Sequence, residues 1–237
     1  MLQAKSLTKR YGATLALDGL DLSVAPGEVF CLLGPNGAGK TTTVNLFLDF
    51  ISPSSGQALV CGIDAAREPH KARQQLAYIP ETVTLYPALS GLENLAYFST
   101  LADGLRRSDD EGLALLAQVG LDAQRARQRV AGYSKGMRQK VGIAVALARR
   151  AKALLLDEPT SGLDPRAANE FAAAIDAMRL KGVAILMVTH DLFLARQCAS
   201  RVGIMQRGRL VTVLDAGSVD HLGLERVYLD SSMEVAA

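Results

Sequence analysis

A glycine-rich segment at residues 34–41, GPNGAGKT, carries the first side chains whose spacing suggests chemistry. It fits the pattern G-x-x-x-x-G-K-[ST], in which glycines let successive backbone N–H groups surround phosphate oxygens. Lys40 can neutralise charge on the β- and γ-phosphates, Thr41 can offer a hydroxyl to Mg²⁺, and Thr42 can hold the α-phosphate. The residues expected to contact the nucleotide are Pro35, Asn36, Gly37, Ala38, Gly39, Lys40, Thr41 and Thr42. The segment predicts a nucleoside triphosphate site, and alone it leaves a kinase, a GTPase and an ATPase open.

Two adjacent acids follow a run of leucines in LLLDEP, residues 154–159. Asp157 stands at the end of an expected buried strand, where an acid is costly unless a positive charge accompanies it. Mg²⁺, directly or through water, is the natural partner. Glu158 comes next, points differently, and can take a proton from an attacking water. An ordinary surface ion pair is the alternative; beside a phosphate loop, the pair favours hydrolysis over transfer to a second substrate.

A second anion-binding segment is YSKGM, residues 133–137, far from the phosphate loop in the sequence. Ser134 is a good N-cap, Gly136 permits close approach and Lys135 adds positive charge. The continuation VGIAVALA is apolar almost all round, which anchors the expected helix in a core. An ordinary capped helix is the alternative interpretation.

The elements that must position these residues alternate between strand and helix. A buried strand at 29–33 leads into the phosphate loop and a helix, and further strands are expected at 153–157 and 183–190. Such alternation favours a largely parallel α/β sheet, whose ligands sit at the carboxyl ends of the strands. The loops after Leu33, Asp157 and Val188 are therefore expected to share one site.

The remaining segments complete the expected architecture. Their expected ranges are strands at 2–7, 15–24, 57–62 and 77–80, a helix at 69–76, a mostly helical insertion from about 83 to 151, a hairpin at 201–215 and one short helix at 221–229.

The composition of the 237 residues is globular, with 49% hydrophobic residues and a net charge of +2, so no nucleic-acid partner is expected. Three scattered cysteines without a signal-like N-terminus predict a reducing compartment. The longest apolar stretches fall short of the roughly 20 residues that a spanning helix needs.

The motifs GPNGAGKT, YSKGM, LLLDEP, SGLD and the TH that ends at His190 occur in the order found in one family. Together they resemble the nucleotide-binding subunits of ABC transporters, over essentially residues 1–215. The resemblance implies a P-loop NTPase (RecA-like) core with a mixed, largely parallel sheet, an antiparallel β subdomain and an inserted helical subdomain. It places the core with the β subdomain at 1–82 and 152–215, the helical subdomain at 83–151 and a short tail at 216–237.

The resemblance also implies roles for single residues. ATP and Mg²⁺ are the implied cofactors, with Thr41, Asp157 and Glu81 near the metal and Lys40, Glu158 and His190 in catalysis. Tyr11 would stack on adenine, or merely pad a strand end. Two subunits would pack head to tail, so that Ser134, Lys135 and Gly136 contact a nucleotide bound by the partner, and Asp164 would lie in the loop that reaches across the dimer.

Three residues depart from the commonest family pattern, and they indicate one group within the family. Lys135 and Met137 replace glycine and glutamine in the signature, and Glu81 replaces the glutamine of the Q-loop, so it can accept but not donate a hydrogen bond. These changes resemble the ABC-2 type group, which mostly exports lipids, polysaccharides, drugs or ions.

The implied partners are a second ATPase subunit, identical or a paralogue, and integral membrane permease subunits. The implied location is cytoplasmic and peripheral on the inner face of the cell membrane. Apolar residues within 85–101 belong either to a helical core or to an interface with the permease.

Two rival functions remain at this point. A soluble ABC ATPase acting on ribosomes, DNA or cofactor assembly usually carries tandem units or extra elements, which the sequence lacks. A nucleotide kinase would need a lid for its acceptor substrate and would leave SGLD without a role.

Overall fold

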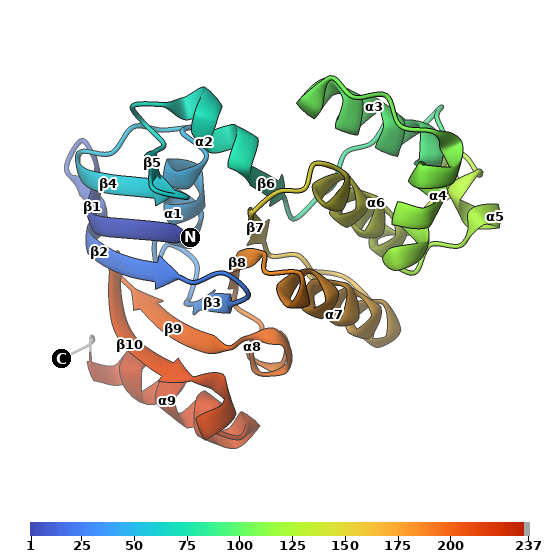
Figure 1. The fold of residues 1–237 in the computed structure, drawn as a ribbon. Coiled ribbons are helices and arrows are strands. Elements are labelled where there is room, and N and C mark those ends of the chain that lie inside the picture. Colours follow the sequence, from blue (N-terminus) through green and yellow to red (C-terminus); the bar gives the residue numbers. More distant parts are fainter. Residues whose placement is uncertain (235–237) are drawn as a thin grey trace.

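A six-stranded sheet forms the centre of the computed structural model, which describes residues 1–234 (Figure 1). Its order is β10-β9-β3-β8-β7-β6, and all neighbouring strands are parallel except β10, which runs antiparallel to β9. The strands are β3 (Val29–Leu33), β6 (Leu76–Ile79), β7 (Ala153–Asp157), β8 (Ala184–Thr189), β9 (Arg201–Gln206) and β10 (Arg209–Asp215). The central strands β3, β8 and β7 are neighbours, so the sheet brings together the three loops that the sequence assigns to one site.

Both faces of the central sheet are buried from β9 to β6, and this explains the continuous apolar runs in these strands. The edge strand β10 alternates between exposed and half-buried residues. Along β3, Phe30 and Leu32 pack into one apolar cluster, whereas Cys31 and Leu33 pack into another. The first cluster lies against the second sheet and α1 (Lys40–Phe47); the second lies against the helices on the opposite face. The phosphate loop thus leaves a strand that is fixed from both sides.

The second sheet is entirely antiparallel, in the order β2-β1-β4-β5. Its strands are β1 (Leu2–Tyr11), β2 (Thr14–Val24), β4 (Ser55–Val60) and β5 (Ile63–Asp64). The strands β1 and β2 are longer than the sequence pattern indicates because they continue to a tight turn at Gly12, where φ is +55°. The short helix α2 (Pro69–Gln75) returns the chain to the central sheet.

The helices α3, α4, α5 and α6 form a group to one side of the sheets (Figure 1). They are α3 (Gly91–Asp103), α4 (Asp109–Gln118), α5 (Ala123–Ala126) and α6 (Lys135–Ala148). Ser90 with Glu93, and Ser108 with Glu111, form capping boxes that start α3 and α4. The helices lie within the segment expected to be a helical insertion. One apolar cluster runs from them into the sheet, so the core is continuous across the expected boundary.

Three more α-helices follow: α7 (Pro165–Leu180), α8 (Leu192–Cys198) and α9 (His221–Glu234). Two short 3-10 helices, Val130–Gly132 and Ala216–Ser218, complete the described chain. The helix α9 is longer than expected from the sequence, since no glycine or proline interrupts residues 224–234. The expected tail at 216–237 therefore contains a helix of 14 residues, and its last three residues lie outside the described part. Within residues 1–234, no helix has the length and apolar character needed to cross a bilayer.

Candidate active site

The phosphate loop lies between β3 and α1, and its glycines are required by close backbone contacts. A Cβ on Gly34 would come within 2.4 Å of the carbonyl oxygen of Met205, and a Cβ on Gly39 within 2.7 Å of the carbonyl oxygen of Ala16. Gly39 is also the N-cap of α1, with φ of 105° and no side chain to accept from the first turn. The positive end of α1 is therefore left for an external anion, and the loop fits a phosphate group.

Lys40 is buried, and its Nζ donates hydrogen bonds to the carbonyl oxygens of Gly34 at 2.6 Å and Pro35 at 3.1 Å. Burial lowers the pKa of Lys40, while the carboxylates of Glu158 and Asp157 oppose that change. The ammonium group is thus held above the loop and beside both acids. A bound phosphate can replace the two carbonyl oxygens and stabilise the charged lysine.

The rim of the loop is open. Pro35, Asn36, Gly37 and Thr41 are exposed, Thr42 is half-buried, and Ala38 is buried. The sequence-predicted contact residues therefore surround one accessible surface at the start of α1.

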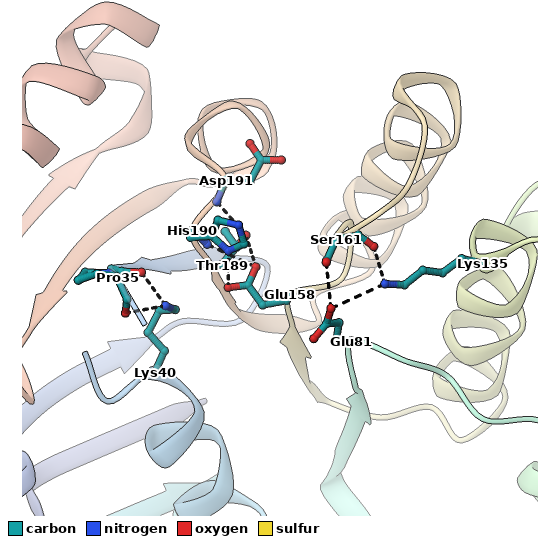
Figure 2. Close-up of polar contacts among 10 residues, drawn as sticks. Pro35, Lys40, Glu81, Lys135, Glu158, Ser161, Thr189, His190 and Asp191 are labelled. Carbon is teal, nitrogen blue, oxygen red and sulfur yellow. Dashed lines mark hydrogen bonds and ion pairs between the residues drawn. The ribbon is translucent and has the colours of Figure 1, made fainter. Parts of the chain in front are cut away.

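Glu158 lies at the carboxyl end of β7, where contacts from β8 fix its side chain. Its N–H donates to the carbonyl oxygen of Val188 at 2.9 Å, and its φ of 45° turns the chain away from the strand. Thr189 Oγ1 donates to Glu158 Oε2 at 2.9 Å, and His190 Nδ1 lies 2.9 Å from Glu158 Oε1 (Figure 2). The imidazole is exposed, whereas the carboxylate is mostly buried, with 63% and 17% of the side chains accessible. The Glu158 carboxylate is therefore held at the edge of the sheet where the parallel strands β7 and β8 end.

Asp157 is half-buried beside Glu158. Burial raises its pKa, the charges of Glu158 and Glu81 raise it further, and Lys40 lowers it. A buried carboxylate beside other negative charges is stabilised when a cation binds to it. Within the described residues, no three His, Cys, Asp or Glu side chains form a metal-binding group, so a cation here would need ligands of other kinds.

The YSKGM segment begins α6, and Ser134 is its N-cap: Ser134 Oγ accepts from the N–H of Met137 at 3.3 Å. Gly136 is buried, and a Cβ there would lie 3.1 Å from Cβ of Ala167 on α7. Its small size therefore lets α6 pack against α7 of the same chain, a reason that the sequence did not reveal.

Lys135 and Glu81 meet at Ser161. Lys135 Nζ donates to the carbonyl oxygen of Ser161 at 2.5 Å, and Ser161 Oγ donates to Glu81 Oε1 at 2.9 Å. Within residues 1–234, no hydrogen bond or ion pair joins 133–137 to the phosphate loop. In Figure 2, Glu158 lies between the Lys40 group and the Lys135 group.

Asp164 and Tyr11 occupy exposed positions. Asp164 is the N-cap of α7 and accepts from the N–H of Ala167 at 2.9 Å. Tyr11 ends β1 with 47% of its surface accessible, and Lys9 Nζ lies 4.9 Å from the ring centroid. The Tyr11 ring is therefore exposed at the end of β1, with the Lys9 ammonium over the ring.

Comparison with known families decides the identity of this site. The family described as ABC transporter matches residues 17–161. The chain belongs to the ABC transporter family. The match includes the phosphate loop, the signature and the two carboxylates, and it confirms the resemblance and the P-loop fold class.

Relatives of this ABC cassette are found among both sequences and structures. A probable multidrug ABC transporter ATP-binding protein of Escherichia coli, YbhF, is 38% identical over 94% of this chain and 38% of its own length. The daunorubicin resistance ATP-binding protein DrrA2 of Streptomyces coeruleorubidus is 37% identical over 89% of this chain and 65% of its own length. The cassette thus spans well under half of YbhF and about two thirds of DrrA2.

Two solved structures share the fold of the cassette over nearly all of its length. An ATP-binding subunit of an ABC transporter is 31% identical, has a TM-score of 0.83 and covers 97% of this chain and 98% of its own. A dimeric bacterial ABC transporter cassette, MJ0796, is 25% identical, has a TM-score of 0.79 and covers 91% of this chain and 99% of its own. The rival assignment to a soluble ABC ATPase is not favoured by these relatives.

Two residues of the cassette site were missed from the sequence. Thr189 and Ser161 each hold a carboxylate by a hydrogen bond from the hydroxyl. Thr189 had a signal, since it ends the buried run AILMVT directly before His190. Ser161 opens the SGLD motif, but nothing in the sequence indicated its contacts, because its partners lie 26 and 80 residues away.

Proposed function

We propose that the cassette binds ATP with Mg²⁺ and that two subunits enclose each nucleotide head to tail. The single observation that carries this proposal is the separation of two open anion-binding elements within one chain. The N-terminus of α1 and the capped start of α6 make no mutual hydrogen bond within the described residues, and Glu158 lies between them. Each catalytic centre would then combine the phosphate loop of one subunit with Ser134 and Gly136 of the other, and MJ0796 is a dimeric precedent.

The residues of the phosphate site fit a metal-bound triphosphate. Thr41 and Asp157 would hold the cation, with Glu81 as an acidic neighbour, and Mg²⁺ would neutralise charge on the phosphates. Lys40 would bind the β- and γ-phosphates, Thr42 the α-phosphate, and the exposed ring of Tyr11 the adenine.

Glu158 would act as the general base for hydrolysis. A water oxygen would attack the γ-phosphorus, and one proton of that water would pass to the Glu158 carboxylate. The bond from the γ-phosphorus to the β–γ bridging oxygen would break, so that ADP leaves and inorganic phosphate forms. His190 orients this carboxylate through Nδ1 and would face the γ-phosphate from its exposed side. Asp164 would lie at the dimer contact, since it caps α7 at an exposed position.

We further propose that the cassette drives separate integral membrane subunits of an exporter, at the cytoplasmic face of the membrane. Two exposed tyrosines, Tyr86 and Tyr97, support a docking surface on the helical part. The Tyr86 ring lies 4.9 Å from that of Tyr97 and 5.8 Å from that of Phe98, measured between centroids. A groove beside this group is lined by Pro80, Val83, Leu85, Phe98, Leu101 and Val145. Export is favoured because relatives are named for multidrug and daunorubicin resistance.

The division of the chain follows the same proposal. Residues 1–82 and 152–215 form the nucleotide-binding core with its β subdomain, 83–151 form the helical subdomain, and 216–237 form the tail.

Copurification with a Glu158→Gln variant tests the proposal. With ATP, the variant is expected to run as a dimer in size-exclusion chromatography and to be recovered from membranes with an integral protein. Lys40→Ala is the matched control, which loses tight ATP binding and remains monomeric. Recovery with ribosomes, or full turnover by a strictly monomeric chain, would overturn it.

A further inference from the structure

The side chain of Lys135 turns back into its own chain. Its Nζ donates to the carbonyl oxygen of Ser161 at 2.5 Å and lies 3.9 Å from Glu81 Oε1, which also accepts from Ser161 Oγ at 2.9 Å. We call Lys135, Ser161 and Glu81 the clasp (Figure 2). The clasp joins the first turn of α6, the turn after β7 and the loop after β6.

The clasp reaches the backbone of the proposed general base. The N–H of Ser161 donates to the carbonyl oxygen of Glu158 at 3.2 Å, so both residues belong to one tight turn. Lys135 binds the carbonyl oxygen of Ser161, and Glu81 binds its hydroxyl. A displacement of Lys135 would therefore remove its hydrogen bond to Ser161 and loosen the turn that carries Glu158.

A second contact from α6 supports the same loop. Gln139 lies four residues after Lys135, on the same helix face, and its Nε2 donates to the carbonyl oxygen of Glu81 at 3.2 Å. Gln139 is 1% exposed, and its Oε1 has no hydrogen-bond partner within the described residues. A buried acceptor without a donor is costly, which favours a second arrangement of the Glu81 loop in which a donor reaches Oε1.

Lys135 lies beside a group of three carboxylates and can offset their mutual repulsion. Glu81 lies near enough to Asp157 for the two carboxylates to repel each other, and Glu158 adds a third negative charge. Lys40 is occupied by the phosphate loop, so Lys135 is the cation that contacts Glu81. Removal of that cation would favour movement of Glu81 away from Asp157.

We propose that Lys135 is a positioning residue for the catalytic centre of its own chain, which it serves by holding Glu81 and the turn after Glu158. This inference rests on the proposed function, in which Ser134 and Gly136 of the same segment serve the partner's nucleotide. Adjacent residues of the signature would then act on opposite catalytic centres of the dimer.

Hydrogen–deuterium exchange of the dilute, nucleotide-free chain tests the clasp directly. Lys135→Met is expected to raise amide exchange in residues 81–82 and 160–162 by about tenfold, and Lys135→Arg to restore slow exchange. Arg138→Met is the matched control, since Arg138 is on the same turn of α6 and its side chain makes no hydrogen bond or ion pair within residues 1–234. Unchanged exchange in Lys135→Met would overturn the proposal.

Mixed dimers determine which catalytic centre Lys135 serves. The reference dimer pairs a wild-type subunit with a Glu158→Gln subunit, which leaves one competent centre. If Lys135→Met is added to the wild-type subunit, turnover is expected to fall about fivefold; if it is added to the Glu158→Gln subunit, turnover is expected to stay at the reference value. The reverse pattern, or an equal loss in both, would overturn the proposal.

The two ideas fail in different ways. A chain that never forms an ATP-dependent dimer would refute the proposed function, whereas the exchange measurement on the single chain would still decide the clasp. If the reference dimer has no measurable turnover, the exchange measurement on the single chain still tests the clasp.

Discussion

His190 Nδ1 lies 2.9 Å from Glu158 Oε1, although the two residues follow different strands of the central sheet. The parallel pairing of β7 with β8 places Asp157 opposite Val188, which brings the next residues of both strands together. The same neighbouring strand supplies the hydroxyl of Thr189 to the other carboxylate oxygen. The orientation of Glu158 is therefore determined by the residues at the end of β8.

Replacement of Glu158 by glutamine should separate binding from hydrolysis. The amide keeps the size and a hydrogen-bond acceptor for Thr189, but it cannot take a proton from water. We expect turnover to fall by about 100-fold or more, with ATP affinity nearly unchanged. Steady-state turnover and equilibrium ATP binding measure the two effects. Unaltered turnover would remove Glu158 from the mechanism.

His190→Ala should affect the catalytic rate more than binding. It removes the ring that holds Glu158 Oε1, while Thr189 still holds Oε2. We expect kcat to fall by about tenfold or more, with a smaller change in KM. His70→Ala is the control, since that histidine is exposed at the start of α2, away from the ends of β7 and β8. Equal behaviour of the two variants would contradict a catalytic role for His190.

Ser134→Arg should block dimer closure. The side chain would project from the exposed start of α6 into the space proposed for the partner's nucleotide. We expect the ATP-dependent dimer of the Glu158→Gln background to disappear, while the monomer keeps its nucleotide affinity. Ser108→Arg is the matched control, because Ser108 caps α4 with the same geometry away from the site. Light scattering with and without ATP measures both; a persistent dimer in Ser134→Arg would argue against the proposed interface.

Asp157→Asn should stabilise the nucleotide-free chain at neutral pH. Burial raises the pKa of Asp157, so the folded state binds the proton more tightly than the unfolded state and the ionised carboxylate lowers stability as pH rises. We expect a Tm higher by about 2 °C at pH 7. The gain should shrink as pH falls toward about 4, where the unfolded carboxyl also becomes protonated.

Thermal unfolding across pH measures this effect. Asp164→Asn is the control, because asparagine also caps helices well and Asp164 is exposed. A gain that is independent of pH would mean that repulsion and burial of the charge are not its cause.

The local parts of the site could be predicted from the sequence. The phosphate loop, the strand before it and the two carboxylates are contiguous segments whose roles follow from residue type and order. Ser134 was correctly predicted as an N-cap, since the cap requires only the following turn. The shared position of the three loops followed from the rule that parallel strands end at one edge.

Contacts between distant segments could not be predicted in this way. Gly136 was assigned to close approach of an anion, yet its close neighbour in the structure is Ala167. Lys135 was assigned to a partner's nucleotide, and its observed contacts are with Ser161 and Glu81. Such pairings depend on how α6 packs against the sheet, which no local pattern contains.

The close approach of Gly136 to Ala167 packs α6 tightly against α7. Ser134 starts α6 and Asp164 starts α7, so the two exposed caps belong to helices that pack closely together within their first turns. Even the Cβ of an alanine at position 136 would require Ala167 to shift by a few tenths of an ångström, so a larger residue would separate the first turns of α6 and α7. In the proposed dimer, movement of one cap would then be passed less directly to the other, even though every group proposed to touch ATP remained intact.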